Sequence, residues 1–149
     1  MAKVAVVYGS MSDETVMQGA CDILDEFGVE WDTLVVSAHR QPEKTAEFAQ
    51  TAASKGIRVI IAGAGLAAAL PGVIAAHTTL PVIGVPIGMV PLNGVDALYS
   101  IVQMPKGIPV AAVGISNAKN AALLAVEILA LSDEELERKL QDYRRKMKE

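Results

Sequence analysis

Hydrophobic positions along the chain fall into short, nearly continuous runs, separated by longer segments in which apolar and polar residues mix. The short runs are typical of strands covered on both faces, and they span residues 4–8, 30–36, 59–62, 81–85 and 108–113. The segments between them predict helices, which we place at residues 13–27, 42–55, 66–77, 95–102 and 117–131. Gly28 and Gly56 are expected to end two of these helices, and Pro42 to open one.

Strands that alternate with helices predict an α/β fold with helices on both faces of a parallel sheet. Right-handed connections leave few topologies, and we expect a three-layer αβα, flavodoxin-like, doubly wound sheet of five strands in the order 2-1-3-4-5. Residues 1–131 are expected to form one such domain, and residues 132–149 to add a C-terminal amphipathic helix to it. Ligands of such sheets bind beyond the carboxyl ends of the strands. The candidate loops are therefore residues 9–13, 37–42, 62–72, 86–94 and 114–120.

The predicted C-terminal helix begins with Ser132 and Glu135, which have the spacing of a capping box. Its apolar stripe, at helical spacing, consists of Leu136, Leu140, Tyr143 and Met147. Such a helix packs on its own subunit or on a neighbouring one. The alternative is a surface for nucleic acid, formed by Arg144, Arg145, Lys146 and Lys148.

The composition excludes several classes of protein. Of the 149 residues, 52% are hydrophobic and 20% are charged, and the formal net charge is −4. This hydrophobic content is too high for a disordered chain, and one cysteine cannot make a disulfide scaffold. The acidic balance argues against a general nucleic-acid binder. No segment predicts a signal peptide or a membrane span, so we expect a cytoplasmic protein with no membrane partner.

Charge is distributed unevenly along the chain. Residues 132–149 hold six acidic and six basic residues, which leaves only 18 of the 30 charged residues for the first 131 positions. Within those positions, the segments 66–76 and 121–131 are apolar nearly all round, as in helices that are buried on every side. One small domain cannot easily bury both segments, and we therefore expect a homo-oligomer.

The loops after the first two strands carry the candidate chemistry. Gly9-Ser10-Met11-Ser12-Asp13 offers hydroxyls and the free N–H groups of a helix start, which suit a phosphate or serve only as a helix cap. Its carboxylate could accept hydrogen bonds from ribose hydroxyls. In the second loop, His39 can accept and donate protons at neutral pH, and Arg40 can bind a phosphate through two parallel hydrogen bonds. The alternative for this loop is an ordinary polar surface.

Other patterns carry weaker indications. Gly63-Ala64-Gly65-Leu66-Ala67-Ala68 matches a dinucleotide fingerprint, but it follows the third strand and no acidic residue lies about 20 positions further on. Its small residues instead allow a flat ligand or a neighbouring subunit to approach the backbone. His77 lies near a helix end, where exposure or a dipole interaction is the simpler explanation. Cys21 is expected in the core, and one cysteine with two distant histidines argues against a metal site.

A series of motifs, in order along residues 3–131, resembles the PurE family. They are Gly9-Ser10-x-Ser12-Asp13, Ser37-Ala38-His39-Arg40-x-Pro42, Ala62-Gly63-Ala64-Gly65, Leu70-Pro71-Gly72, Leu80-Pro81-Val82-Ile83-Gly84-Val85-Pro86, residues 100–110 and Asn120-Ala121-Ala122-Leu123-Leu124-Ala125. The family contains N5-carboxyaminoimidazole ribonucleotide mutases of purine biosynthesis and animal-type enzymes that carboxylate aminoimidazole ribonucleotide with CO2 directly. Leu70-Pro71-Gly72 and Gln103-Met104-Pro105 resemble the mutase branch.

The resemblance implies a role for each loop. His39 would be the general acid and base of a mutase that moves CO2 from the exocyclic N5 to ring carbon C4. Arg40 would hold the ribose phosphate, Asp13 would take the ribose hydroxyls, and the loop at 63–72 would exclude water so that CO2 is not lost. The expected substrate-binding residues are Ser10, Ser12, Asp13, Ser37, Ala38, Arg40, Ala64, Gly65, Ala67, Ala68 and Leu70. The family also implies a homo-octamer with no metal and no cofactor.

The chain departs from the family pattern at two positions. Ala69 stands where the mutase branch usually has an active-site histidine, and Gln41 stands where a threonine is usual. The first departure leaves two alternatives open. One is a carboxylase that uses CO2 directly on aminoimidazole ribonucleotide or a related substrate, and the other is a non-catalytic nucleotide-binding relative. A receiver-like signalling domain is disfavoured, because its acidic Mg²⁺-binding cluster is missing.

Overall fold

The computed structural model describes residues 3–149 and contains a five-stranded parallel sheet in the order β2-β1-β3-β4-β5. The strands are β1 (Val4–Tyr8), β2 (Trp31–Val35), β3 (Val59–Gly65), β4 (Val82–Ile87) and β5 (Ala111–Ala112). This order confirms the doubly wound, flavodoxin-like α/β fold. Val4 pairs with both Trp31 and Val59, so β1, β2 and β3 start level and the loops that follow them share one edge of the sheet.

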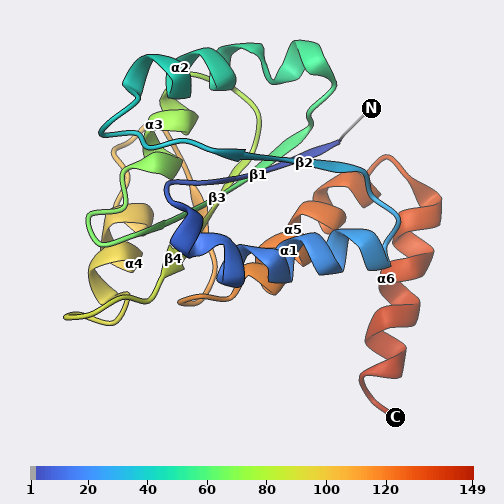
Figure 1. Cartoon of the computed structure of the whole chain (residues 1–149). Coiled ribbons are helices and arrows are strands. Elements are labelled where there is room, and N and C mark those ends of the chain that lie inside the picture. The colour runs from blue at the N-terminus through green and yellow to red at the C-terminus, as the bar shows by residue number, and fades with distance from the viewer. Residues whose placement is uncertain (1–2) are drawn as a thin grey trace.

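Helices cover both faces of the sheet. They are α1 (Glu14–Glu26), α2 (Pro42–Thr51), α3 (Leu70–Ala76), α4 (Val95–Val102), α5 (Ala118–Ala130) and α6 (Glu134–Lys146). Figure 1 shows α2, α3 and α4 on one face, with α1 and α5 on the other. Val4 and Val6 belong to the core under α1 and α5, whereas Ala5 and Val7 belong to the core under α2, α3 and α4. This alternation explains why the strand sequence is continuously apolar.

The strands at one side of the sheet differ in length from the prediction. β4 continues through Pro86 and Ile87, which the sequence assigned to a loop, and β3 continues through Gly65. Proline is tolerated late in β4 because, in the described part of the chain, β5 pairs only with Ile83 and Gly84. The predicted strand at 108–113 shrinks to two residues at this edge, where Pro109 has no N–H to donate.

The helix predicted at 66–77 begins four residues later, at Leu70. Leu66 has a φ of 53°, a left-handed conformation that an α-helix cannot contain. Residues 66–69 therefore form a short loop at the carboxyl edge of the sheet. At the other end of α3, His77 is the C-cap residue and is exposed. This position agrees with the expectation that His77 is an exposed residue at a helix end.

The other helix boundaries lie close to the prediction. α1 ends shortly before Gly28, whose φ of 69° confirms the predicted stop. α2 opens with Pro42 at its first position, as predicted, but ends at Thr51 and gives way to a short 3-10 turn (Ala53–Lys55).

Asp133, and not Ser132, caps the C-terminal helix. Its carboxylate accepts hydrogen bonds from the N–H groups of Glu135 at 3.1 Å and Leu136 at 3.2 Å. The capping box predicted from Ser132 to Glu135 is therefore wrong. A carboxylate at this position satisfies free N–H groups and also interacts favourably with the helix dipole.

The apolar stripe of α6 packs on the rest of the chain. Leu136 is buried, and Leu140 and Tyr143 pack against the same core, while Met147 is exposed. The ring of Tyr143 lies 5.5 Å from that of Phe27 between centroids. Two of the basic side chains considered for nucleic acid also make ion pairs within the chain. Arg144 lies 2.8 Å from Glu127, and Arg145 lies 3.2 Å from Asp142. The structure thus favours a packing role for α6.

Burial of α5 does not require a second subunit. Its small residues are completely buried under α1, α6 and the sheet of the same chain, and they are Ala121, Ala122, Ala125 and Val126. Several of the apolar side chains left exposed lie together on α4 and the loop before it, while others are scattered and include Leu131 at the end of α5. Val90 is 80% exposed and Tyr99 63%, and Leu92, Val95 and Val102 are also exposed. The homo-oligomer remains a prediction, with α4 as its expected contact.

Candidate active site

A cavity of about 430 Å³ lies at the carboxyl edge of the sheet, where the loops after β1, β2, β3 and β4 meet. All the predicted catalytic and substrate-binding residues line it. They are Ser10, Ser12, Asp13, Ser37, Ala38, His39, Arg40, Ala64, Gly65, Ala67, Ala68 and Leu70. The fold therefore brings together side chains that are up to 60 positions apart in the chain. Their individual roles remain predictions.

The loop after β1 presents two hydroxyls to this cavity. Ser10 caps a 3-10 turn (Met11–Asp13) that precedes α1, and its hydroxyl accepts a hydrogen bond from the Ser12 N–H at 3.3 Å. The two hydroxyl oxygens lie 3.0 Å apart. Ser10 thus caps the 3-10 turn, whereas the N-cap residue of α1 is Asp13, so the expectation that a serine of this loop caps the long helix is wrong. Hydroxyls grouped at the start of a helix suit the oxygens of an anion.

Asp13 is the buried carboxylate of the site, with 6% of its surface exposed. Burial raises the pKa of its carboxyl above the usual range, and a hydrogen bond with the backbone of Ser10 opposes this shift. A carboxylate removed from water in this way gains from any ligand group that donates hydrogen bonds to it. A pair of ribose hydroxyls is such a group.

Hydrogen bonds within the loop after β2 define its shape. The Ser37 hydroxyl accepts from the backbone N–H of Arg40 at 3.2 Å and from its Nε at 3.4 Å. Gln41 closes the loop, because its side-chain oxygen accepts from the Ser37 N–H at 3.4 Å and its own N–H donates to the Ser37 carbonyl at 2.7 Å. Gln41 thus has a structural role at the position where it departs from the family pattern. His39 and Arg40 are exposed beside the cavity.

The wall contributed by the loop after β3 is apolar. Ala64, Ala68 and Leu70 are buried, whereas Ala67 is exposed. The cavity therefore has a polar half, with hydroxyls, a carboxylate, an imidazole and a guanidinium, and an apolar half made largely of methyl groups. A ligand with a phosphate and ribose at one end and a flat ring at the other matches this division.

Four lining residues were not among the predicted site residues, namely Gly9, Leu66, Ala69 and Met89. Met89 lies in one of the candidate loops, but its side chain carries no chemistry that would single it out. The pairing of Gly65 with Ile87 brings the loop after β4 beside the loop after β3. Leucine and methionine are most often core residues, so the sequence gives no signal for these two.

The remaining candidates of the sequence analysis lie outside the cavity. Cys21 is buried, and burial raises the pKa of its thiol to about 11, so the predicted core role is confirmed.

Within residues 3–149, no three His, Cys, Asp or Glu side chains are grouped so that they could hold a metal ion. Of the helices that the structure describes, none is long and apolar enough to cross a membrane.

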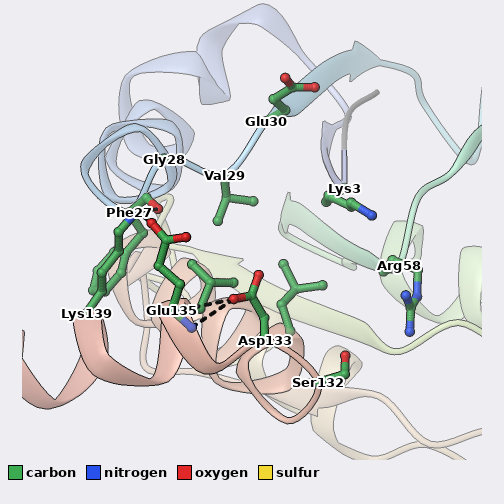
Figure 2. Close-up of a pocket in the computed structure, with 12 residues that line it drawn as sticks. Lys3, Phe27, Gly28, Val29, Glu30, Arg58, Ser132, Asp133, Glu135 and Lys139 are labelled. Carbon is green, nitrogen blue, oxygen red and sulfur yellow. Dashed lines mark hydrogen bonds and ion pairs between the residues drawn. The ribbon is translucent and has the colours of Figure 1, made fainter.

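A second hollow, of about 510 Å³, lies at the opposite, amino edge of the sheet. Figure 2 shows acidic and basic side chains around it, namely Lys3, Arg58, Lys139, Glu30, Asp133 and Glu135. Lys139 donates to the Phe27 carbonyl at 3.1 Å and lies 3.6 Å from Glu135. Of these groups, Lys139 connects α6 to the end of α1 through the Phe27 carbonyl, whereas Asp133 and Glu135 make their contacts within α6.

Comparison with known proteins shows what this chain resembles in sequence and in fold. The family model described as AIR carboxylase matches residues 3–149. The N5-carboxyaminoimidazole ribonucleotide mutase of Pyrococcus abyssi is 58% identical over 148 residues, which are 99% of this chain and 85% of that protein. The mutase of Bacillus subtilis is 55% identical over 148 residues, covering 98% and 91%. The crystal structure of Treponema denticola PurE has a TM-score of 0.89 at 29% identity, covering 98% of this chain and 91% of that one.

Proposed function

The chain belongs to the AIR carboxylase family, and we propose that it is an N5-carboxyaminoimidazole ribonucleotide mutase, an isomerase of purine biosynthesis. The observation that carries this proposal is the cavity, in which His39, Arg40 and the buried Asp13 lie together beside an apolar wall. The relatives that span almost the whole chain carry the mutase name. The direct carboxylase considered because of Ala69 is therefore not favoured.

The proposed substrate position follows the division of the cavity. The phosphate lies against Arg40 and the hydroxyls of Ser10 and Ser12, which offer a planar fork of donors and two O–H groups. The ribose hydroxyls donate to Asp13 and replace the water that burial has removed from its carboxylate. The aminoimidazole ring then lies against the alanine-rich wall after β3, within reach of the loop that carries His39.

The proposed chemistry needs one group that both gives and takes a proton. The bond between N5 and the carboxylate carbon breaks, CO2 is released within the site, and His39 gives a proton to N5. CO2 then forms a bond with C4, and His39 takes the proton that C4 loses. The proton that His39 gives to N5 is regained from C4, so a single imidazole completes the cycle. These bond changes and proton transfers need no metal ion and no organic cofactor. We therefore expect the activity to survive dialysis against a chelator.

The test is turnover of N5-carboxyaminoimidazole ribonucleotide without ATP or added bicarbonate. We expect the parent to form the C4-carboxylated product and His39→Asn to lose a factor of about 10²–10⁴ in kcat. His77→Asn is the matched control, because His77 is exposed outside the cavity and its replacement should leave kcat unchanged. A well-folded parent that produces this product only from aminoimidazole ribonucleotide and bicarbonate would be a direct carboxylase instead.

The proposed assembly is a homo-octamer in the cytoplasm. The exposed apolar side chains of α4 and its preceding loop support a contact between subunits, since monomers rarely expose such patches. Two measurements test this part of the proposal. Sedimentation of the purified protein gives the oligomeric state, and fractionation of cells gives the compartment.

A further inference from the structure

The loop after β5, residues 114–120, contributes no residue to the cavity lining that the structure describes, although it was one of the candidate loops. It contacts instead the loop after β4, which carries Met89 into the cavity. The Ser116 N–H donates to the Pro86 carbonyl at 2.7 Å, and the Ser116 hydroxyl accepts from the Gly88 N–H at 3.0 Å. These two hydrogen bonds hold the backbone directly before Met89.

The backbone of Ser116 has an unfavourable conformation. Its φ of 58° lies in the left-handed region, which residues other than glycine, asparagine and aspartate seldom adopt. The side chain is exposed, so packing in the core does not explain why a serine is present. Glycine would remove the strain but would also remove the hydroxyl. The hydrogen bond from Gly88 is therefore the feature that gives the serine a role.

The residue before Ser116 also packs on the loop after β4. A Cβ atom at Gly94 would lie 2.5 Å from Ile115 Cγ2, and one at Gly88 would lie 3.3 Å from the same atom, so the two glycines leave room for this side chain. The Asn93 N–H donates to the Met89 carbonyl at 2.8 Å and closes the loop. The loop after β4 thus lies against the loop after β5 through both a side chain and hydrogen bonds.

Met89 reaches the cavity on the other side of its loop. A Cβ atom at Gly65 would lie 2.5 Å from Met89 Sδ and 3.2 Å from its Cγ, so the glycine leaves room for the thioether. The methyl groups of Ala64 and Ala68 belong to the same apolar half of the cavity. Met89 remains 39% exposed, and a thioether side chain is flexible. Its position therefore depends on where the backbone before it is held.

We propose that Ser116 is a positioning residue for the substrate ring. Its hydroxyl fixes the backbone before Met89, and the thioether of Met89 then borders the apolar half of the cavity, against which the aminoimidazole ring lies. Contact with the face of the ring is made equally in the bound substrate and in the transition state, so it lowers KM and leaves kcat nearly unchanged. This inference rests on the proposed function for the identity of the ligand.

The experiment separates the hydroxyl of Ser116 from the strain of its backbone. Ser116→Gly accommodates the left-handed backbone but lacks the hydroxyl, whereas Ser116→Asn accommodates it and offers a side-chain oxygen in place of the hydroxyl. Ser54→Ala is the matched control, because it removes an exposed hydroxyl that donates to the Thr51 carbonyl outside the cavity. Steady-state kinetics with N5-carboxyaminoimidazole ribonucleotide give KM and kcat for each variant.

We expect Ser116→Gly to raise KM by a factor of about 3 to 10, as for the loss of one hydrogen bond, with kcat nearly unchanged. Ser116→Asn and Ser54→Ala should keep the KM of the parent. Met89→Ala should raise KM by itself, and adding Ser116→Gly should then raise it little further, because the serine acts through Met89. An unchanged KM in Ser116→Gly, or effects of the two changes that simply multiply, would overturn the inference.

A second measurement needs no turnover. In protein labelled with ¹³C at the methionine methyl groups, the NMR signal of Met89 is identified by its loss in Met89→Ala. We expect this signal to shift or broaden in Ser116→Gly and to return in Ser116→Asn, while the signal of the fully buried Met17 stays in place. An unmoved Met89 signal in Ser116→Gly would refute the positioning role. A folded parent that does not turn over the substrate would instead refute the proposed function, and the role for the ring with it.

Discussion

At the scale of single residues, Asp13 is expected to improve substrate binding but to lower the stability of the ligand-free protein. The pKa of its carboxyl is raised in the folded protein because the group is buried. At pH values above this raised pKa the carboxyl is charged, and burying that charge lowers the stability of the fold. Below the pKa of the unfolded chain, about 4, the carboxyl is protonated in both states and the penalty is absent. The contribution of this group to stability is therefore full in acid and is lost as the pH rises through the folded-state pKa.

We expect Asp13→Asn to raise the melting temperature of the ligand-free protein at pH 7, and the gain to disappear below about pH 4. The same change should raise KM for the ribonucleotide at least about tenfold, because a hydrogen bond to a charged group is lost. Thermal melts between pH 3.5 and 8 and steady-state kinetics measure the two effects. Asp32→Asn, at an exposed position of β2, should change neither. A lower melting temperature of Asp13→Asn at pH 7 would contradict this account.

At the scale of secondary-structure elements, the start of α6 offers a direct test of its cap. The Asp133 carboxylate accepts two hydrogen bonds from the first turn, whereas Ser132 precedes the cap position. We expect Asp133→Ala to lower the free energy of unfolding by about 1 kcal/mol and Ser132→Ala to change it by much less. Urea denaturation measures both values. Equal losses, or a larger one at Ser132, would restore the capping box that the sequence suggested.

α6 is also expected to unfold together with the sheet. Its Leu136 belongs to the same buried core as β1, α1 and α5, and Lys139 is bonded to the end of α1. We expect the fluorescence of Trp31, in β2, and the helical circular dichroism to change in one coincident transition with urea. An earlier loss of helical signal would mean that residues 132–149 form a unit separate from residues 1–131.

At the scale of the whole molecule, the exposed apolar face of α4 predicts the contact between subunits. Tyr99 is 63% exposed although it is large and partly apolar, so a second copy is expected to cover it. We expect Tyr99→Glu to shift the sedimenting species from an octamer towards smaller forms while the circular dichroism is retained. Met147→Glu, an exposed change on α6, should leave the octamer intact. A parent that sediments as a monomer at micromolar concentration would refute the assembly.

The sequence by itself determined the order of strands and helices, the sheet topology and the polar residues of the cavity. These features are local or follow from general rules. Buried strands are continuously apolar, parallel connections are right-handed, and polar residues such as His39 and Arg40 stand out at a strand end. These polar residues lie together at the carboxyl edge of the sheet because the strands that they follow are parallel.

Only the tertiary structure decided the features that depend on contacts distant in sequence. The late start of α3 follows from the left-handed Leu66, and the two-residue β5 reflects its position at the sheet edge. Met89 joins the cavity because Gly65 and Ile87 pair across two strands. The burial of α5 within one chain depends on where α6 packs. In each case the sequence leaves several local conformations close in free energy, and packing against remote residues selects one of them.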